Sequence, residues 1–225
     1  MKRDTAFSYA CSGCGRCCFQ KRIVVSPYEI ARLAEALALS TSEVIARYTS
    51  EDGTVLRQRE DGGCSLLDGK RCGVHRGRPL VCRLYPLGRI VQRGQGEHFV
   101  QLSGHPESEG VFGEHGTIGE FIDAQGTKPY IDATARYFEL FARLVAVIQA
   151  RPAGTSTFQD VIARGANQAR SSDEEDVLEW IDIDRTLARR SAEQPPHELA
   201  ARVALHLALL EREIARLESE AERAD

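Results

Sequence analysis

Cysteine is the residue of this sequence best suited to chemistry, and it occurs seven times in 225 residues. Four cysteines fall within eight residues near the N-terminus and three follow after a gap of 45 residues: Cys11, Cys14, Cys17, Cys18, Cys64, Cys72 and Cys82. A C-x-x-C step lets two thiolates converge on one metal ion, because the intervening turn directs both side chains inward. Gly13 and Gly15 occupy that turn, where a positive φ is often needed.

Metal ligation explains these thiols better than disulfides do. Seven is an odd number, so a disulfide framework would leave one cysteine over. The apolar fraction of 42% allows an ordinary core, and the N-terminus has no hydrophobic stretch typical of a secretory signal. We therefore expect a reducing cytoplasm, where disulfides are rare. Cys17 and Cys18 are adjacent, and we expect their side chains to diverge, because binding one ion through both would strain the backbone.

The spacing leaves the metal open. Cys11, Cys14 and Cys17 form the C-x2-C-x2-C start of bacterial ferredoxin sequences, which favours an iron–sulfur cluster with a fourth ligand from elsewhere. Any four of the thiolates would equally satisfy a zinc ion, with or without a histidine. Soft sulfur ligands exclude magnesium and calcium but do not separate iron from zinc.

Charge is unevenly distributed along the chain. Residues 1–100 contain 16 Lys and Arg against 10 Asp and Glu, whereas residues 101–225 contain 13 against 23. The basic excess is too small for a nucleic-acid-binding surface. Arg71, Arg76, Arg78 and Arg83 lie beside the later cysteines, where their charge would offset that of thiolates. No run of about 18 apolar residues predicts a membrane span.

Helices are predicted from capping boxes and apolar periodicity. Three capping boxes mark helix starts: Ser26 to Glu29, Ser40 to Glu43 and Thr117 to Glu120. Apolar residues recur at helical spacing over 131–149 and again over 199–217. The second stripe suits packing against another helix or a protein partner. His206 lies on that stripe, and we expect a core or interface histidine rather than a ligand.

Strand signals are shorter and confined to the first part of the chain. Segments 19–25 and 54–59 are typical of strands, and the residues flanking 94–96 predict a hairpin. We therefore predict an α+β fold, in which a small irregular β and loop metal-binding core is surrounded by helices. The expected domains are 1–150, containing all the cysteines, and a helical C-terminal extension, 151–225, joined at RPAGTST. Cysteines 11–18 and 64–82 must then meet in space.

The cysteine motifs resemble a known family. CSGCGRCC (11–18) and GGCSLLDGKRCGVHRGRPLVCRLYPLG (62–88) are similar to the CxxCxxCC or YkgJ-like cysteine-cluster family, described as zinc- or iron-chelating. The later motif matches the family pattern at nine positions: Cys64, Leu67, Cys72, Arg78, Pro79, Cys82, Arg83, Tyr85 and Pro86. The resemblance covers about residues 7–105 and extends more loosely to about 150.

The resemblance implies a cytoplasmic bacterial protein with a metal centre formed by the seven cysteines. It places His105 where many members have a further cysteine, so His105 becomes an eighth candidate ligand. It places His75 where the family has an aromatic residue, which indicates packing. Arg78, Arg83 and Tyr85 are expected to surround the ligands and tune the site.

Three functions fit these features. The first is an iron–sulfur or single-metal centre with a redox or catalytic role. The second is a structural zinc module that presents the C-terminal helices to a protein partner. The third is suggested by a distant similarity to flagellin lysine methylases, but the sequence has no glycine-rich nucleotide-binding signature of the Rossmann type. The sequence names no catalytic residue, and whether the protein is an enzyme stays open.

Overall fold

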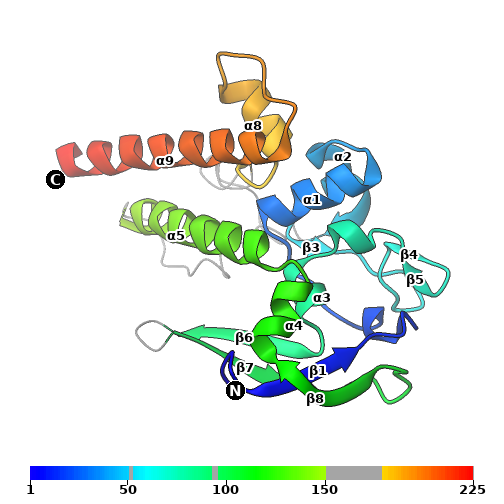
Figure 1. Cartoon of the computed structure of the whole chain (residues 1–225). Helices are drawn as coiled ribbons and strands as arrows, with labels where there is room; N and C mark the ends of the chain where they lie inside the picture. Colours follow the sequence, from blue (N-terminus) through cyan, green and yellow to red (C-terminus); the bar gives the residue numbers. More distant parts are fainter. Residues whose placement is uncertain (51–52, 93–95, 151–178, 225) are drawn as a thin grey trace. The chain divides into compact units, whose positions relative to one another are not determined.

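The computed structural model describes residues 1–50, 53–92, 96–150 and 179–224. The chain divides into two compact units, each built from two chain segments (Figure 1). The cysteine unit comprises Met1–Ile23 and Arg57–Ile131, and the helical unit comprises Val24–Leu56 and Asp132–Asp225. Helices and small antiparallel sheets coexist, so the predicted α+β class is confirmed.

Short antiparallel sheets build the cysteine unit. They pair β1 (Ala6–Ala10) with β8 (Val111–Thr117), β4 (Leu67–Asp68) with β5 (Arg71–Cys72), and β6 (Leu87–Gln92) with β7 (Gly96–Gln101). The β6–β7 pair confirms the predicted hairpin. The β1–β8 pair was not predicted, because its strands lie about a hundred residues apart and neither alternates clearly between apolar and polar residues.

Helical turns carry three of the seven cysteines, Cys17, Cys18 and Cys82. The elements are two 3₁₀ turns, η1 (Arg16–Cys18) and η2 (His75–Gly77), and two short helices, α3 (Leu80–Leu84) and α4 (Ile118–Ala124). Helix α4 begins at the predicted Thr117 capping box. A small core of Phe7, Phe99, Ile118 and Ile122 is fully buried. The Met1 amino group donates to the Phe99 carbonyl at 2.8 Å, which attaches the chain start to this core.

Helices dominate the other unit. Its elements are α1 (Pro27–Leu37), α2 (Thr41–Tyr48), β2 (Thr49–Ser50), β3 (Val55–Leu56), most of α5 (Lys128–Ala150), α8 (Ile183–Arg190) and α9 (Leu199–Ala224). The capping boxes predicted at Ser26 and Ser40 begin α1 and α2. The long periodic segments form α5 and α9, as predicted.

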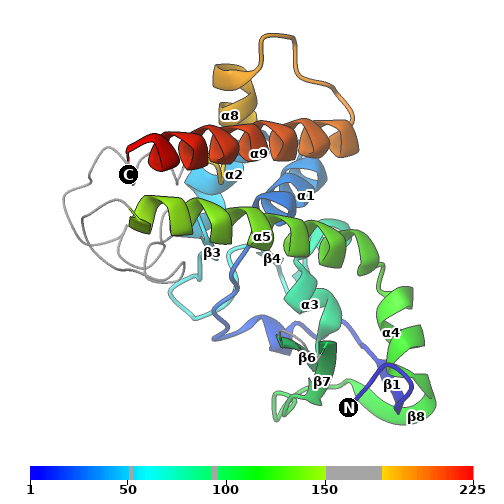
Figure 2. The ribbon, with the colours of Figure 1, turned by 90° about the vertical axis from the view of Figure 1, so that its left-hand side faces the viewer.

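Helices α5 and α9 lie side by side (Figure 2). Arg136 pairs with Glu211 at 2.8 Å and Arg143 with Glu218 at 2.7 Å, about two turns apart on each helix. Beneath these pairs, the apolar stripe of α9 is buried within the unit, including Leu210. The stripe therefore serves internal packing, and a protein partner for this helix stays a prediction.

His206 is buried in the helical core, as predicted. Its Nδ1 lies 2.8 Å from the Tyr137 hydroxyl, and its ring centre lies 5.8 Å from that of Trp180. Nε2 has no hydrogen-bond partner among the described residues. Burial lowers the pKa of His206 to about 4, partly opposed by the charge of Asp182, so the ring is neutral in the folded protein.

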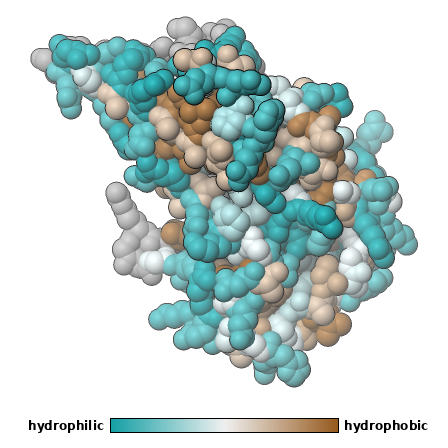
Figure 3. All heavy atoms as spheres, turned by 45° about the horizontal axis from the view of Figure 1, so that its top comes forward, coloured by the Kyte–Doolittle hydropathy of each residue, from teal (hydrophilic) through white to brown (hydrophobic). Residues whose placement is uncertain are grey.

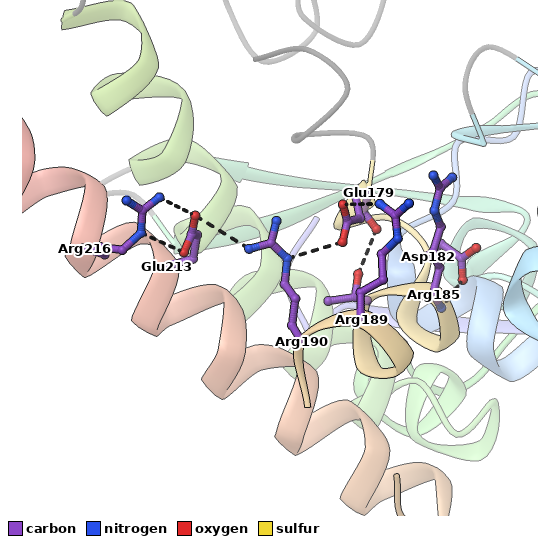
Figure 4. Close-up of polar contacts among 8 residues, drawn as sticks. Glu179, Asp182, Arg185, Arg189, Arg190, Glu213 and Arg216 are labelled. Atoms are coloured by element: carbon purple, nitrogen blue, oxygen red, sulfur yellow. Dashed lines mark hydrogen bonds and ion pairs between the residues drawn. The ribbon is translucent and has the colours of Figure 1, made fainter. Parts of the chain in front are cut away.

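Carboxylates near α8 join this helix to its neighbours. Asp182 accepts hydrogen bonds from the hydroxyls of Thr41 and Ser42, both at 2.6 Å. A second link is shown in Figure 4, where the buried carboxylate of Glu179 forms ion pairs with Arg189 and Arg190. Arg190 extends to Glu213 of α9, where Arg216 also binds.

Two strand predictions are wrong. Segment 19–25 forms only isolated bridges, Phe19 to Gly63 and Val24 to Val55. Segment 54–59 contains the two-residue strand β3 and an isolated bridge from Gln58 to Cys64, and no continuous strand. The reason is that each segment is divided between the two compact units, so its ends have different neighbours.

The compact units do not coincide with the expected domains 1–150 and 151–225, since residues 24–56 are grouped with the C-terminal helices. Those domain boundaries stay a prediction, because the proposed joint at 151–157 lies outside the described residues.

Hydrophilic residues occupy much of the face drawn in Figure 3, interrupted by hydrophobic patches. Among the described helices, none combines the length and the apolar character needed to cross a bilayer.

Candidate metal centre

Backbone contacts bring the two groups of cysteines together, as predicted. The amide of Cys64 donates to the carbonyl of Cys18 at 2.9 Å. Gly15 lies against Lys70 so closely that a Cβ atom would be 2.2 Å from the Lys70 carbonyl oxygen, and its φ is +73°. Only glycine fits this position, because a side chain would collide with backbone that has little freedom to move.

The side chains of Cys17 and Cys18 do not diverge, so that expectation is wrong. Their Sγ atoms are 4.0 Å apart. The 3₁₀ turn η1 produces this arrangement, since the Cys18 amide bonds back to the Gly15 carbonyl at 3.0 Å. Two thiolates bound tetrahedrally to one zinc ion at about 2.3 Å would be about 3.8 Å apart. The pair is thus spaced as two ligands of one ion would be.

Five thiols lie close enough to influence one another's ionisation: Cys17, Cys18, Cys64, Cys72 and Cys82, here called the inner cysteines. All five are partly buried. A hydrogen bond from the Cys18 thiol lowers the pKa of Cys17 to about 7, and the same bond together with burial raises the pKa of Cys18. One member of the pair is therefore readily ionised, and its neighbour remains a thiol until a metal displaces the proton.

Backbone amides donate to the sulfur atoms in a repeated pattern. The donor is the residue two positions after the cysteine: Arg16 for Cys14, Leu66 for Cys64 and Val74 for Cys72. Such bonds favour the thiolate, although burial outweighs them at Cys64 and Cys72, where the pKa is raised. Hydrogen bonds to sulfur also stabilise metal-bound thiolates.

Cys11 and Cys14 lie on the N-terminal side of the inner cysteines, and Cys11 is exposed. A loop at residues 105–109 contacts this part of the chain. The Glu109 amide donates to the Cys14 sulfur and is the main cause of the lowered Cys14 pKa. Arg16 pairs with Glu107 at 3.0 Å. The C-x-x-C step is therefore attached to the loop that contains His105.

His105 is held in this loop by its backbone and one ring nitrogen. Its amide donates to the Tyr85 hydroxyl at 3.2 Å, and its Nδ1 accepts from the Glu107 amide at 3.1 Å. Nε2 is then the ring atom with which His105 would ligate a metal. Tyr85 thus positions the candidate histidine, and its ring also packs edge-on against Tyr9.

Arg83 is engaged in holding the backbone of the cysteine unit. Its guanidinium donates to the carbonyl oxygens of Arg76, Arg78 and Gln125. It also donates to the Tyr130 hydroxyl at 2.9 Å and lies over the Tyr130 ring at 4.3 Å. These contacts indicate a structural role beside the cysteines rather than binding of an anion.

Arg78 has a different environment. Its Nη1 donates to His75 Nε2 at 2.6 Å, and its Nη2 donates to the Gln125 side chain. Its charge adds to the lowering of the Cys17 pKa by Cys18, and it partly opposes the rise that burial causes in the pKa of Cys72. His75 therefore supports Arg78. Sequence analysis missed Gln125, because nothing in the pattern at the end of α4 indicates that it contacts the arginines.

Within the part of the chain that the structure describes, no three His, Cys, Asp or Glu side chains already converge closely enough to hold a metal ion. The donors present nevertheless fit zinc or iron, since they are partly buried thiols with amide donors directed at sulfur. The ligand roles of the seven cysteines and His105 stay a prediction.

Comparison with known proteins identifies the cysteine motifs. Residues 10–102 match the model of the CxxCxxCC family, described as a "Putative zinc- or iron-chelating domain". An uncharacterized protein of Methanocaldococcus jannaschii is 35% identical over 92 residues, which are 39% of this chain and 50% of that protein. The chain thus matches about half the length of this relative, and no solved structure matches. The chain is therefore similar to the CxxCxxCC family over residues 10–102, which make up less than half of its length.

Proposed function

We propose that the cysteine unit binds a single zinc or iron ion through thiolates of the inner cysteines. The observation that carries the proposal is that two of these partly buried thiols, Cys64 and Cys72, receive backbone N–H bonds from the residues two positions later. Packing alone does not require amides directed at sulfur, whereas metal-bound thiolates are stabilised by them. The 4.0 Å separation of the Cys17 and Cys18 sulfurs supports two ligands on the same ion.

An iron–sulfur cluster with a redox role is the second candidate. The C-x2-C-x2-C start and the number of thiols favour it. The Cys17–Cys18 separation favours the single ion, because in a four-iron cluster each thiolate binds a different iron. In both cases the metal would cross-link residues 17–18 to residues 64–82, and backbone amides would orient the Cys64 and Cys72 sulfurs.

Metal analysis and an absorption spectrum of protein purified without oxygen test the proposal. We expect one zinc or iron per chain and no acid-labile sulfide. Iron together with sulfide and broad absorption near 400 nm would establish the cluster instead. Protein that takes up neither metal, even after reduction and reconstitution, would show that the proposal is wrong.

Matched cysteine variants locate the site. Cys72→Ser removes an inner cysteine and should abolish stoichiometric metal binding, whereas Cys11→Ser alters an exposed thiol and should retain it. Equal loss in both variants would place the C-x-x-C step within the metal site. Equal retention would contradict the inner-cysteine assignment.

A further inference from the structure

Arg78 carries a buried hydrogen-bond donor that has no acceptor among the described residues. That donor is Nε, while Nη1 and Nη2 are bonded to His75 and Gln125. The two bonds fix the plane of the guanidinium, so the direction of the Nε–H bond is fixed as well. Leaving a buried donor without an acceptor is destabilising, and more so for a charged group, because its hydrogen bond to water is lost and not replaced. An acceptor that becomes available in another state of the protein would remove this cost.

The charge of Arg78 also lacks a carboxylate partner within the described residues. By contrast Arg59, which acts on Cys64, is paired with Asp61 at 3.1 Å. The sulfurs on which Arg78 acts are those of Cys17 and Cys72, which come from the two separate cysteine groups. Four thiolates around a divalent ion would leave about two negative charges uncompensated. The unpaired guanidinium therefore lies beside the place where negative charge accumulates on metal binding.

We infer that the Nε–H group of Arg78 donates to a thiolate of the metal centre, that of Cys17 or Cys72, and that its charge stabilises the metal-bound form. This inference rests on the proposed metal site. Arg78 is then a positioning residue that acts on the metal through sulfur. Arg83 fixes the carbonyls around it and keeps the loop that carries Arg78 in place. The two arginines of the motif thus have separate tasks.

Zinc affinity is the first test, measured by competition with a chromophoric chelator. Arg78→Met removes both the charge and the N–H donor, and should raise the apparent dissociation constant for zinc by about 10–100-fold, the usual effect of losing a group that supports metal ligands. Arg78→Lys keeps the charge without the planar donor, and its dissociation constant should fall between those of the parent and Arg78→Met. Arg76→Met is the matched control, because Arg76 is an exposed arginine on the neighbouring turn, and its dissociation constant should stay within about threefold of that of the parent.

A direct readout uses protein loaded with a spin-half cadmium isotope, which replaces zinc on thiolates. A scalar coupling between cadmium and the Arg78 Nε proton would demonstrate the N–H···S bond. Absence of that coupling, together with an Arg78→Lys affinity equal to the parent, would overturn the inference. If Arg78→Met fails to fold without metal, the coupling in the parent protein decides between the outcomes. Failure of the parent to bind either metal would contradict the proposed function instead, so the two failures are distinguishable.

Discussion

The two compact units of this protein are held together by different means. The helical unit contains most of the buried apolar side chains, including Trp180, Leu140 and Leu210, and adds ion pairs between α5 and α9. The cysteine unit has strands as short as two residues and a small core. A unit with so little apolar burial is marginally stable by itself. We therefore expect the helical unit to be stabilised mainly by apolar burial and the cysteine unit to depend on the proposed metal.

The same contrast explains which parts of the fold can be predicted from the sequence. In the helical unit, periodicity and capping boxes act locally, and Ser26, Ser40 and the stripe of α9 indicate the observed helices. In the cysteine unit, conformation is set by thiols and turns that are distant in sequence. Local propensity therefore predicts little of the structure of this unit, whereas the cysteine motif predicts which segments come together.

Metal removal should have the largest effect on stability, and that effect should be confined to the cysteine unit. Chelation, or Cys64→Ser, should remove roughly 10 kcal/mol of stabilisation from the cysteine unit, the scale of structural zinc sites. Hydrogen-exchange mass spectrometry should show lost protection in residues 57–92 and 96–131, with protection retained in α5 and α9. Loss of protection in both units would show that they fold as one.

Leu210→Ala should produce the converse result. Leu210 is fully buried in the helical unit, and truncation of a buried leucine costs about 2–5 kcal/mol. Denaturant unfolding followed through helical circular dichroism should show the loss, while zinc content stays that of the parent. A fall in zinc content with Leu210→Ala would break the proposed independence of the units.

Acid should destabilise the helical unit through His206. Because its folded-state pKa is about 4 and its unfolded pKa about 6.5, the unfolded chain binds the proton more readily between these values. Stability is therefore lost as pH falls from 6.5 towards 4, by up to about 3 kcal/mol. Trp180, the single tryptophan, packs against His206 and reports unfolding by fluorescence. His206→Gln should flatten this pH dependence, and His197→Gln, at an exposed site, should keep it.

The smallest effect expected is that of a helix cap. Ser26→Ala removes the side chain that accepts from the Glu29 amide at the start of α1, and should cost about 1 kcal/mol. Ser50→Ala is the matched control, since Ser50 is exposed and caps no helix, and should stay within about 0.5 kcal/mol of the parent. Thermal unfolding of both variants measures the difference. An equal shift of the unfolding temperature in both variants would show that this cap does not contribute to the stability of the helical unit.

The site was predictable in part. The pairing of the two cysteine groups followed from their motifs, and the Cys64–Cys18 backbone bond confirms it. The convergence of Cys17 and Cys18 did not follow, because it depends on the left-handed Gly15 that begins η1. The different contacts of Arg78 and Arg83 also could not be predicted from the motif. They depend on Gln125 and Tyr130, which come from about 40 residues farther along the chain.

Each unit contains one segment that is synthesised early and one that is synthesised late, so neither unit can be completed until its second segment has left the ribosome. Cys18 is synthesised 64 residues before Cys82, which at about 5–20 residues per second is an interval of roughly 3–13 s. Throughout that interval the first four thiols are present without the complete later group. If a metal is to join the two groups, these four thiols must stay reduced until Cys82 has been added.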